Sequence, residues 1–399
     1  MRWILFFSLL CQALFHGFAQ TQQASIELSQ VEASYQFGST LTIQAQFSSP
    51  TELQDASLDI QSASGGPETY PLTISTAEAL STQIDLANLN LQPFSRIYYW
   101  FEFSFSDGSK FTSPSYWFDY VDNRFTWQSN QSKWFAIYWA NGDTTFGAKL
   151  QEIALAGLKN ATQILPVSPD LPITIYVYPD AQSAQAILSS TEPAWVAGEA
   201  LPQLNMIIVS AATDLSSAQD LERQIPHEIT HLLEYKLTQQ NYSASPAWLL
   251  EGLASNAETS PNPDYAREIQ KALADHNLIP MSQLCHAFSP DTNTATLAYA
   301  QSGSFVNYLT SQYGSDKVMG LLENSGNGLD CSQLVNSVLG KNLETLDSDW
   351  QSSIQAQSTD QNGALKYWPY FVIGIVLLTV LVLFSRFYLI KKAKKNGSK

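Results

Sequence analysis

The chain has 399 residues, room for two or three domains, and its composition is 14% charged and 12% aromatic. The formal net charge at pH 7 is −16. A surface this acidic repels a phosphate backbone, which excludes a nucleic-acid partner. The many aromatic and few charged residues indicate packed domains and not a disordered chain.

The N-terminal end has the pattern of a targeting segment. Residues 1–19 start with the basic Arg2, continue into a short apolar run and end with Gly17-Phe18-Ala19, where small residues precede a cut before Gln20. The apolar run is too short to cross the ~30 Å of a bilayer core, so it predicts a signal peptide and not a membrane anchor.

The C-terminal end predicts a membrane anchor. Residues 367–390 are almost entirely apolar, which is typical of a transmembrane helix, and the lysine-rich residues 391–399 predict a cytoplasmic tail. A buried core helix is the alternative, which the lack of a polar face disfavours. A polar linker at 358–366 precedes the span. The sequence therefore predicts a single-pass protein of the cell membrane whose N-terminal domains are extracytoplasmic.

Residues 20–127 predict an all-β domain, an immunoglobulin-like or fibronectin-like sandwich of about seven strands. Apolar side chains alternate from Ile97 to Phe105, Asp107-Gly108 marks a hairpin turn, and 111–118 supplies the return strand. A ligand platform is the other interpretation of the aromatic strand, but a sandwich core explains the alternation better. No catalytic constellation is visible here.

Residues 128–357 predict an α+β domain, a mixed sheet followed by an all-α subdomain. Apolar residues at helical spacing predict a helix over 147–165, and strands follow at 171–178 and 204–210. The next helix, at 214–235, contains Pro226, which marks either a kink or the start of the helix. The helices expected after it cover 246–258, 263–275, 295–313, 315–323, 331–338 and 343–356.

The helix at 214–235 carries the residues that predict chemistry. His227 and His231 are four positions apart, so they share one helix face and can hold one metal ion. Glu228 lies beside the first histidine, within reach of a water on that ion. Zinc needs a third protein ligand, and Glu251, on the next predicted helix, is the candidate.

H-E-x-x-H at 227–231, followed by W-x-x-E-G-x-A at 248–254, resembles the gluzincin zinc metallopeptidases, and more narrowly the peptidase MA-like domains. The likeness covers residues 128–357. It implies a zincin-like fold, a peptide or protein substrate, and an endopeptidase or an aminopeptidase-like hydrolase. It also implies the roles of four residues: one Zn²⁺ ion held by His227, His231 and Glu251, with Glu228 as the general base.

The resemblance also suggests residues around the metal. Tyr299 is the candidate donor that stabilises the transition state, with an ordinary helix tyrosine as the alternative, and His276 and His286 lack motif support. Ser255 is a candidate to support a zinc histidine, and Glu234 is expected to be solvated. The strand at 204–210 is expected to be the sheet edge that pairs with an extended substrate.

Cys285 and Cys331 are the two cysteines that remain after removal of the signal peptide. An even pair in an exported domain predicts a disulfide, and two buried free thiols are the alternative.

Two functions remain open. The first is a membrane-anchored extracytoplasmic zinc metallopeptidase. The second is a metal-binding protein of peptidase fold with a binding or sensing role and little turnover. Glu228 favours the first, because a pure binding module has no need of a base at that position.

Overall fold

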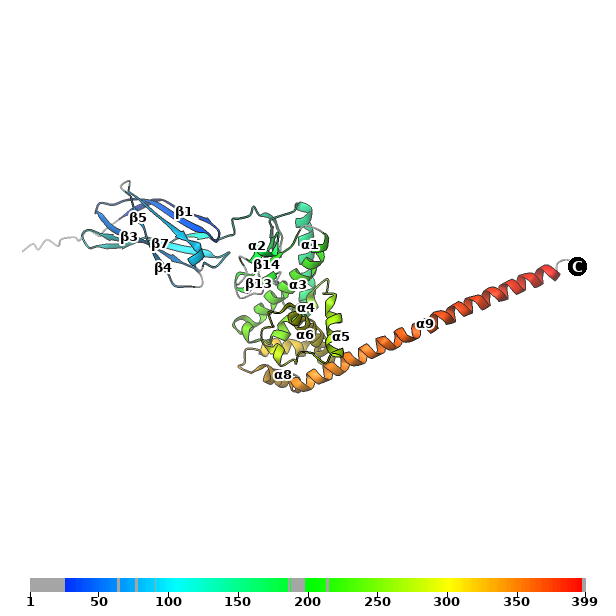
Figure 1. Ribbon diagram of the computed structural model, residues 1–399. Coiled ribbons are helices and arrows are strands. Elements are labelled where there is room, and N and C mark those ends of the chain that lie inside the picture. Colours follow the sequence, from blue (N-terminus) through cyan, green and yellow to red (C-terminus); the bar gives the residue numbers. More distant parts are fainter. Residues whose placement is uncertain are drawn as a thin grey trace, which may run out of the picture. The chain divides into compact units, whose positions relative to one another are not determined.

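The computed structural model describes residues 26–396, apart from 63–64, 76–77, 90, 186, 188–197 and 213–214. Two compact units, Met1–Phe125 and Thr126–Lys399, make up the chain (Figure 1). The predicted signal peptide at 1–19 lies outside the described residues.

The N-terminal unit contains two antiparallel sheets. One has the strand order β1-β2-β6-β5, and the other has the order β4-β3-β7-β8, with β9 also paired to β7. The strands are β1 (Glu27–Gln36), β2 (Thr40–Ser48), β3 (Leu53–Gln61), β4 (Glu68–Pro71), β5 (Thr73–Ile74), β6 (Ala79–Asp85), β7 (Arg96–Phe105), β8 (Lys110–Thr112) and β9 (Tyr116–Asp119). The prediction of a β-rich N-terminal region is confirmed.

Strand β7 shows why this unit folds. Its residues from Ile97 to Phe105 alternate between buried and more exposed positions, and Phe101 is fully buried. Gly108 forms the hairpin turn at φ +83°, a conformation that glycine adopts without strain. The return strand predicted at 111–118 is broken into β8 and β9, because Pro114 has no N–H for the ladder. At the break, the hydroxyl of Ser113 accepts the N–H of Phe101 at 2.9 Å.

The second unit begins with a five-stranded sheet of order β10-β11-β12-β14-β13. Strands β11, β12 and β14 are parallel, and the two outer strands are antiparallel to their neighbours. The strands are β10 (Gln128–Gln131), β11 (Phe135–Trp139), β12 (Ile173–Tyr178), β13 (Gly198–Leu201) and β14 (Met206–Ser210). The strand expected at the edge of the sheet, 204–210, is therefore an inner strand. It is covered by β13, which lacks the apolar alternation that would predict a strand.

Helices make up the rest of this unit, and the mixed region followed by helices fits the predicted order. They are α1 (Thr144–Ile164), α2 (Ala181–Gln185), α3 (Leu215–Thr238), α4 (Ala247–Ala257), α5 (Asp264–Ala274), α6 (Thr292–Tyr313), α7 (Ser315–Asn324), α8 (Cys331–Leu339) and α9 (Leu343–Asn396). Helix α9 runs unbroken through the predicted linker at 358–366. Among the residues that the structure describes, no helix is long and apolar enough to cross a membrane, and the transmembrane helix predicted at 367–390 finds no support.

Three buried rings hold the helical part together. The ring of Phe305 on α6 lies 5.0 Å from that of Trp248 on α4 and 5.9 Å from that of Trp350 on α9. Cys285 and Cys331 form the predicted disulfide. The indole N–H of Trp248 donates to the sulfur of Cys331 at 3.4 Å, so the covalent link is packed directly against the aromatic core.

Candidate metal centre

Pro226 lies inside α3, so it neither starts nor ends the helix. A proline in a helix frees the carbonyl four residues before it, here that of Glu222. Both the N–H of Thr259, at 3.1 Å, and its hydroxyl, at 2.6 Å, donate to this carbonyl oxygen. The proline therefore ties α3 to the residues that follow α4, next to the metal-ligand candidates.

A second close approach positions the same stretch of α3. A Cβ added to Gly157 on α1 would lie 2.8 Å from Cγ of Pro226. Only glycine lets the two helices come this close, which explains why Gly157 interrupts the apolar stripe of α1. Helix α3, which carries the two histidines, is thus held by α1 through Gly157 and by Thr259, which follows α4.

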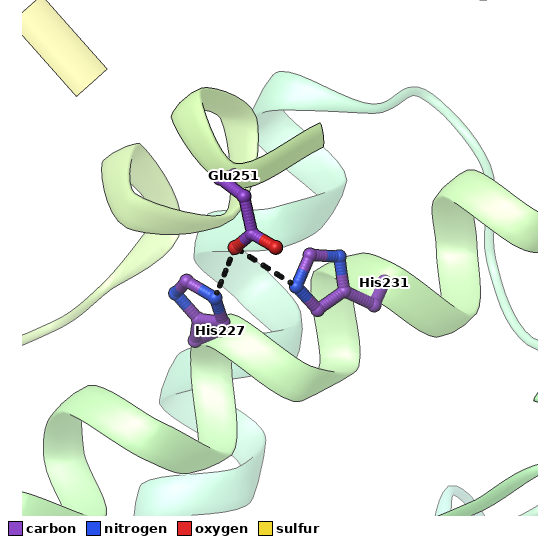
Figure 2. A group of neighbouring side chains, drawn as sticks. All are labelled: His227, His231 and Glu251. Atoms are coloured by element: carbon purple, nitrogen blue, oxygen red, sulfur yellow. Dashed lines mark hydrogen bonds and ion pairs between the residues drawn. The ribbon is translucent and has the colours of Figure 1, made fainter. Parts of the chain in front are cut away.

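The three predicted ligands come together, as Figure 2 shows. Nε2 of His227 lies 3.1 Å from Oε2 of Glu251, and Nε2 of His231 lies 3.5 Å from the same oxygen. One atom from each residue falls within 4.8 Å of the others. The pair of histidines comes from successive turns of α3, and Glu251 reaches them from α4.

Gly252 explains how α6 joins this arrangement. A Cβ at this position would lie 2.6 Å from the carbonyl oxygen of Ser302 and 2.5 Å from Cγ2 of Val306. The glycine after the ligand Glu251 therefore allows α6 to pack directly on α4. One turn before Ser302, α6 carries Tyr299.

The far nitrogen of each imidazole meets another carboxylate. Nδ1 of His227 lies 3.3 Å from Oε1 of Glu258, and Nδ1 of His231 lies 2.8 Å from Oε2 of Glu234. The hydroxyl of Tyr242 is also 3.3 Å from Nδ1 of His231. Such contacts set the ring orientation and leave both Nε2 atoms facing Glu251. Glu234 is fully buried, so the expectation that it is solvated is wrong.

Burial and charge shift the pKa values of this cluster. Burial alone would lower the pKa of His227, but the carboxylates of Glu251 and Glu258 raise it to about 9. Burial opposes protonation of His231 as well, and the pKa is still well above its usual value because Tyr242, Glu251 and Glu234 surround the ring. The surrounding carboxylates therefore favour positive charge on both imidazoles, at the place where a cation would be held.

The carboxylates respond in opposite directions. Burial tends to raise the pKa of Glu251, yet the two imidazoles hold it well below its usual range. Burial raises the pKa of Glu234 to about 7. Burial also raises the pKa of Glu228, against the pull of the neighbouring histidines.

The side chain of Glu228, on α3, lies next to the edge strand β13. Its carboxylate accepts the backbone N–H of Ala200. A Cβ on Gly198 would lie 3.4 Å from Oε1 of Glu228. The true edge strand therefore borders the predicted base, in the position that the sequence assigned to 204–210.

A cavity of about 260 Å³ opens in front of these residues, bounded by α3, α5, α6 and β13. His227, Glu228 and Tyr299 line it together with Arg223 and Tyr265. The ring of Tyr299 lies 6.0 Å from that of His227. His276, His286 and Ser255 are not among its lining residues.

The residues present fit a zinc ion. Two imidazole nitrogens and one carboxylate oxygen converge, which is the donor set of a site that keeps a position open for water. Each histidine has its other nitrogen on a carboxylate, as zinc-bound histidines do. Oε1 of Glu234 and Oε2 of Glu258 are buried without a hydrogen-bond partner among the described residues, and such carboxylates are stabilised by a nearby cation.

Sequence reasoning found the three ligands but missed Glu258, Glu234, Tyr242 and β13. Glu234 carried a signal, because it lies three residues after His231 and so on the same side of the helix. Glu258 carried none, since its approach depends on the contact between Thr259 and the freed carbonyl of Glu222.

Solved structures resemble the chain only weakly. An aminopeptidase N family protein from Idiomarina loihiensis is 8% identical, with a TM-score of 0.37 over 80% of this chain and 73% of its own. The carbohydrate-binding module BhCBM56 is 17% identical, with a TM-score of 0.18 over 22% of this chain and 88% of its own. OgpA from Akkermansia muciniphila is 14% identical, with a TM-score of 0.22 over 25% of this chain and 30% of its own. Likenesses this weak support no statement about function.

A search of curated proteins found no significant match. The family comparison is decisive instead. A model of the peptidase MA superfamily matches residues 151–356, from helix α1 into α9. The matched stretch contains H-E-x-x-H at 227–231 and the acidic residue Glu251 that joins it in space. The chain therefore belongs to the peptidase MA superfamily.

Proposed function

We propose that this protein is a zinc-dependent peptidase that hydrolyses peptide bonds of a peptide or protein substrate. The observation that carries the proposal is the convergence of His227, His231 and Glu251 beside the buried carboxylate of Glu228. When bound, a zinc ion would supply a Lewis acid that activates water and polarises the substrate carbonyl.

The protein's own residues support three roles. Glu228 faces the cavity and is buried, so it is suited to take a proton from water and return it to the leaving amine. Tyr299 lines the same cavity, where its hydroxyl is suited to stabilise charge on the substrate oxygen. Strand β13 borders Glu228, and as an edge strand it offers main-chain groups to an extended substrate.

We further propose that the enzyme acts in an oxidising, extracytoplasmic compartment. The Cys285–Cys331 disulfide supports this proposal, because such bonds persist in exported domains and are rare in reducing ones.

The test compares the zinc-loaded full chain with its Glu228→Gln variant on a peptide library. Loss of the base is expected to lower kcat by ~10²–10⁴-fold, while zinc content stays unchanged because Glu228 is not among the converging ligands. Equal turnover in both proteins would overturn the role of Glu228. Bound zinc with no turnover in the wild type would favour the binding or sensing role instead.

A further inference from the structure

A second, larger cavity adjoins the candidate active site. Its volume is about 730 Å³, and it lies among α4, α5, α6 and the start of α9. Tyr265 on α5 lines both this cavity and the smaller one in front of His227. The two cavities are therefore neighbours that meet at Tyr265.

Helix α6 lines both cavities. Tyr299 lines the active-site cavity, and Gly303, Asn307 and Ser311 line the larger one. These residues are spaced by four, so they form one stripe along one face of the helix. At 1.5 Å per residue the stripe runs ~18 Å away from the active site. An extended chain covers that distance with about five residues.

The side chains that line the larger cavity are uncharged and mostly polar, which indicates what kind of molecule it can bind. None of the described residues that line the larger cavity is charged, and most are serine, asparagine, glutamine or tyrosine. The amide of Asn307 donates to Asn256 at 2.8 Å, and that of Asn256 donates to the carbonyl of Gly303 at 3.1 Å, which fixes the floor of the groove. Hydroxyl and amide groups both donate and accept, so they can pair with main-chain N–H and C=O groups whatever the side chains are.

We propose that this groove, defined by Gly303, Asn307, Ser311 and Tyr265, holds an extended, unfolded stretch of the polypeptide substrate, about five residues on one side of the scissile bond. The proposal rests on the proposed peptidase function, and its occupant is argued from the position of the groove beside the candidate active site, along the same face of α6. Uncharged small side chains are preferred, because the lining offers no charge to pair with.

The test is a series of fluorogenic peptides, extended with Ser, Ala and Asn by one to eight residues on one side or on the other. With the zinc-loaded full chain, kcat/KM is expected to rise about tenfold or more with length on one side only. The rise should level off at about five residues. A series that is flat on both sides overturns the groove.

Two variants locate the effect. Asn307→Trp, ~12 Å along α6 from Tyr299, should end the gain at about three to four residues. Thr310→Trp is the matched control, since Thr310 is exposed on the same helix but does not line the cavity, and it should keep the wild-type series. A wild-type series in Asn307→Trp, with the fold intact by circular dichroism, overturns the proposal.

A binding assay separates the groove from the chemistry. Fluorescence anisotropy of the same peptides, labelled, is measured on zinc-loaded Glu228→Gln. If no peptide is hydrolysed by the wild type, the proposed function fails, but affinity that rises with length and falls in Glu228→Gln/Asn307→Trp still supports the groove. Affinity independent of length overturns it.

Discussion

The two units of the chain handle buried charge differently. In the N-terminal unit the buried Asp122 is paired with Arg124 at 2.6 Å, the buried Asp59 accepts a hydrogen bond from the hydroxyl of Thr69, and the core is otherwise made largely of apolar side chains. In the second unit, Glu228, Glu234 and Glu258 are buried beside the ligand Glu251. Among the described residues, no lysine or arginine forms an ion pair with any of these four glutamates.

The difference shows what the second unit requires. Burying an unpaired carboxylate is costly, and a fold held by packing alone has no reason to gather four of them. Two imidazoles offset part of the charge by holding protons, as the raised pKa values of His227 and His231 indicate. A divalent cation bound in place of these protons would likewise offset two of the four negative charges. The first unit is thus stabilised mainly by apolar packing, whereas the second also buries a group of charged side chains at one site.

A substitution in the apolar core of the N-terminal unit should destabilise that unit strongly and leave the metal site unchanged. Phe101→Ala removes a fully buried ring from the sandwich and should lower the free energy of unfolding of that unit by ~3–5 kcal/mol. Urea unfolding followed by hydrogen exchange resolves the two units. Zinc affinity should remain at the wild-type value, and a loss of zinc binding in this variant would show that the units are not independent.

Substitution of the two carboxylates that contact Nδ1 of the histidines should weaken zinc binding. Glu258→Gln and Glu234→Gln should each weaken zinc binding by ~10–100-fold, because each removes the group that orients an imidazole. Competition against a fluorescent chelator measures this affinity. The control is Glu323→Gln on α7, where the side chain is exposed. If all three variants bind zinc equally, Glu258 and Glu234 do not act on the site.

The smallest effect is the pH dependence of the metal-free protein. The pKa of His227 is raised from 6.5 to about 9 in the folded state, so the folded state binds more protons than the unfolded one. The stabilisation is fully present below pH 6.5 and is lost as the pH rises through about 9. Urea unfolding of the second unit in the presence of a chelator should therefore show a decline over this range. A constant unfolding free energy would contradict the proposed proton binding.

The sequence predicted what depends on local pattern. Alternation gave β7, helical spacing gave α1, and the i, i+4 spacing gave the two histidine ligands. Glu251, on another helix, followed from the need of zinc for a third ligand and from the resemblance of its motif. The rest depends on tertiary contacts. Strand β13 has too few residues to show a period, and the path of α3 through Pro226 depends on Thr259, which is distant in the sequence. The burial of Glu234 requires Tyr242 and the neighbouring helices, which no local pattern shows.

We propose that the buried cluster of histidines and glutamates binds zinc and hydrolyses peptide bonds with it. The most direct measurement follows peptide hydrolysis by the full chain together with its zinc content, before chelation, after chelation and after zinc is returned. We expect about one zinc per chain, activity that disappears with the metal, and activity that returns with it. A chain that binds no zinc, or one that cleaves peptides equally well without it, would show that the protein is not a zinc-dependent peptidase.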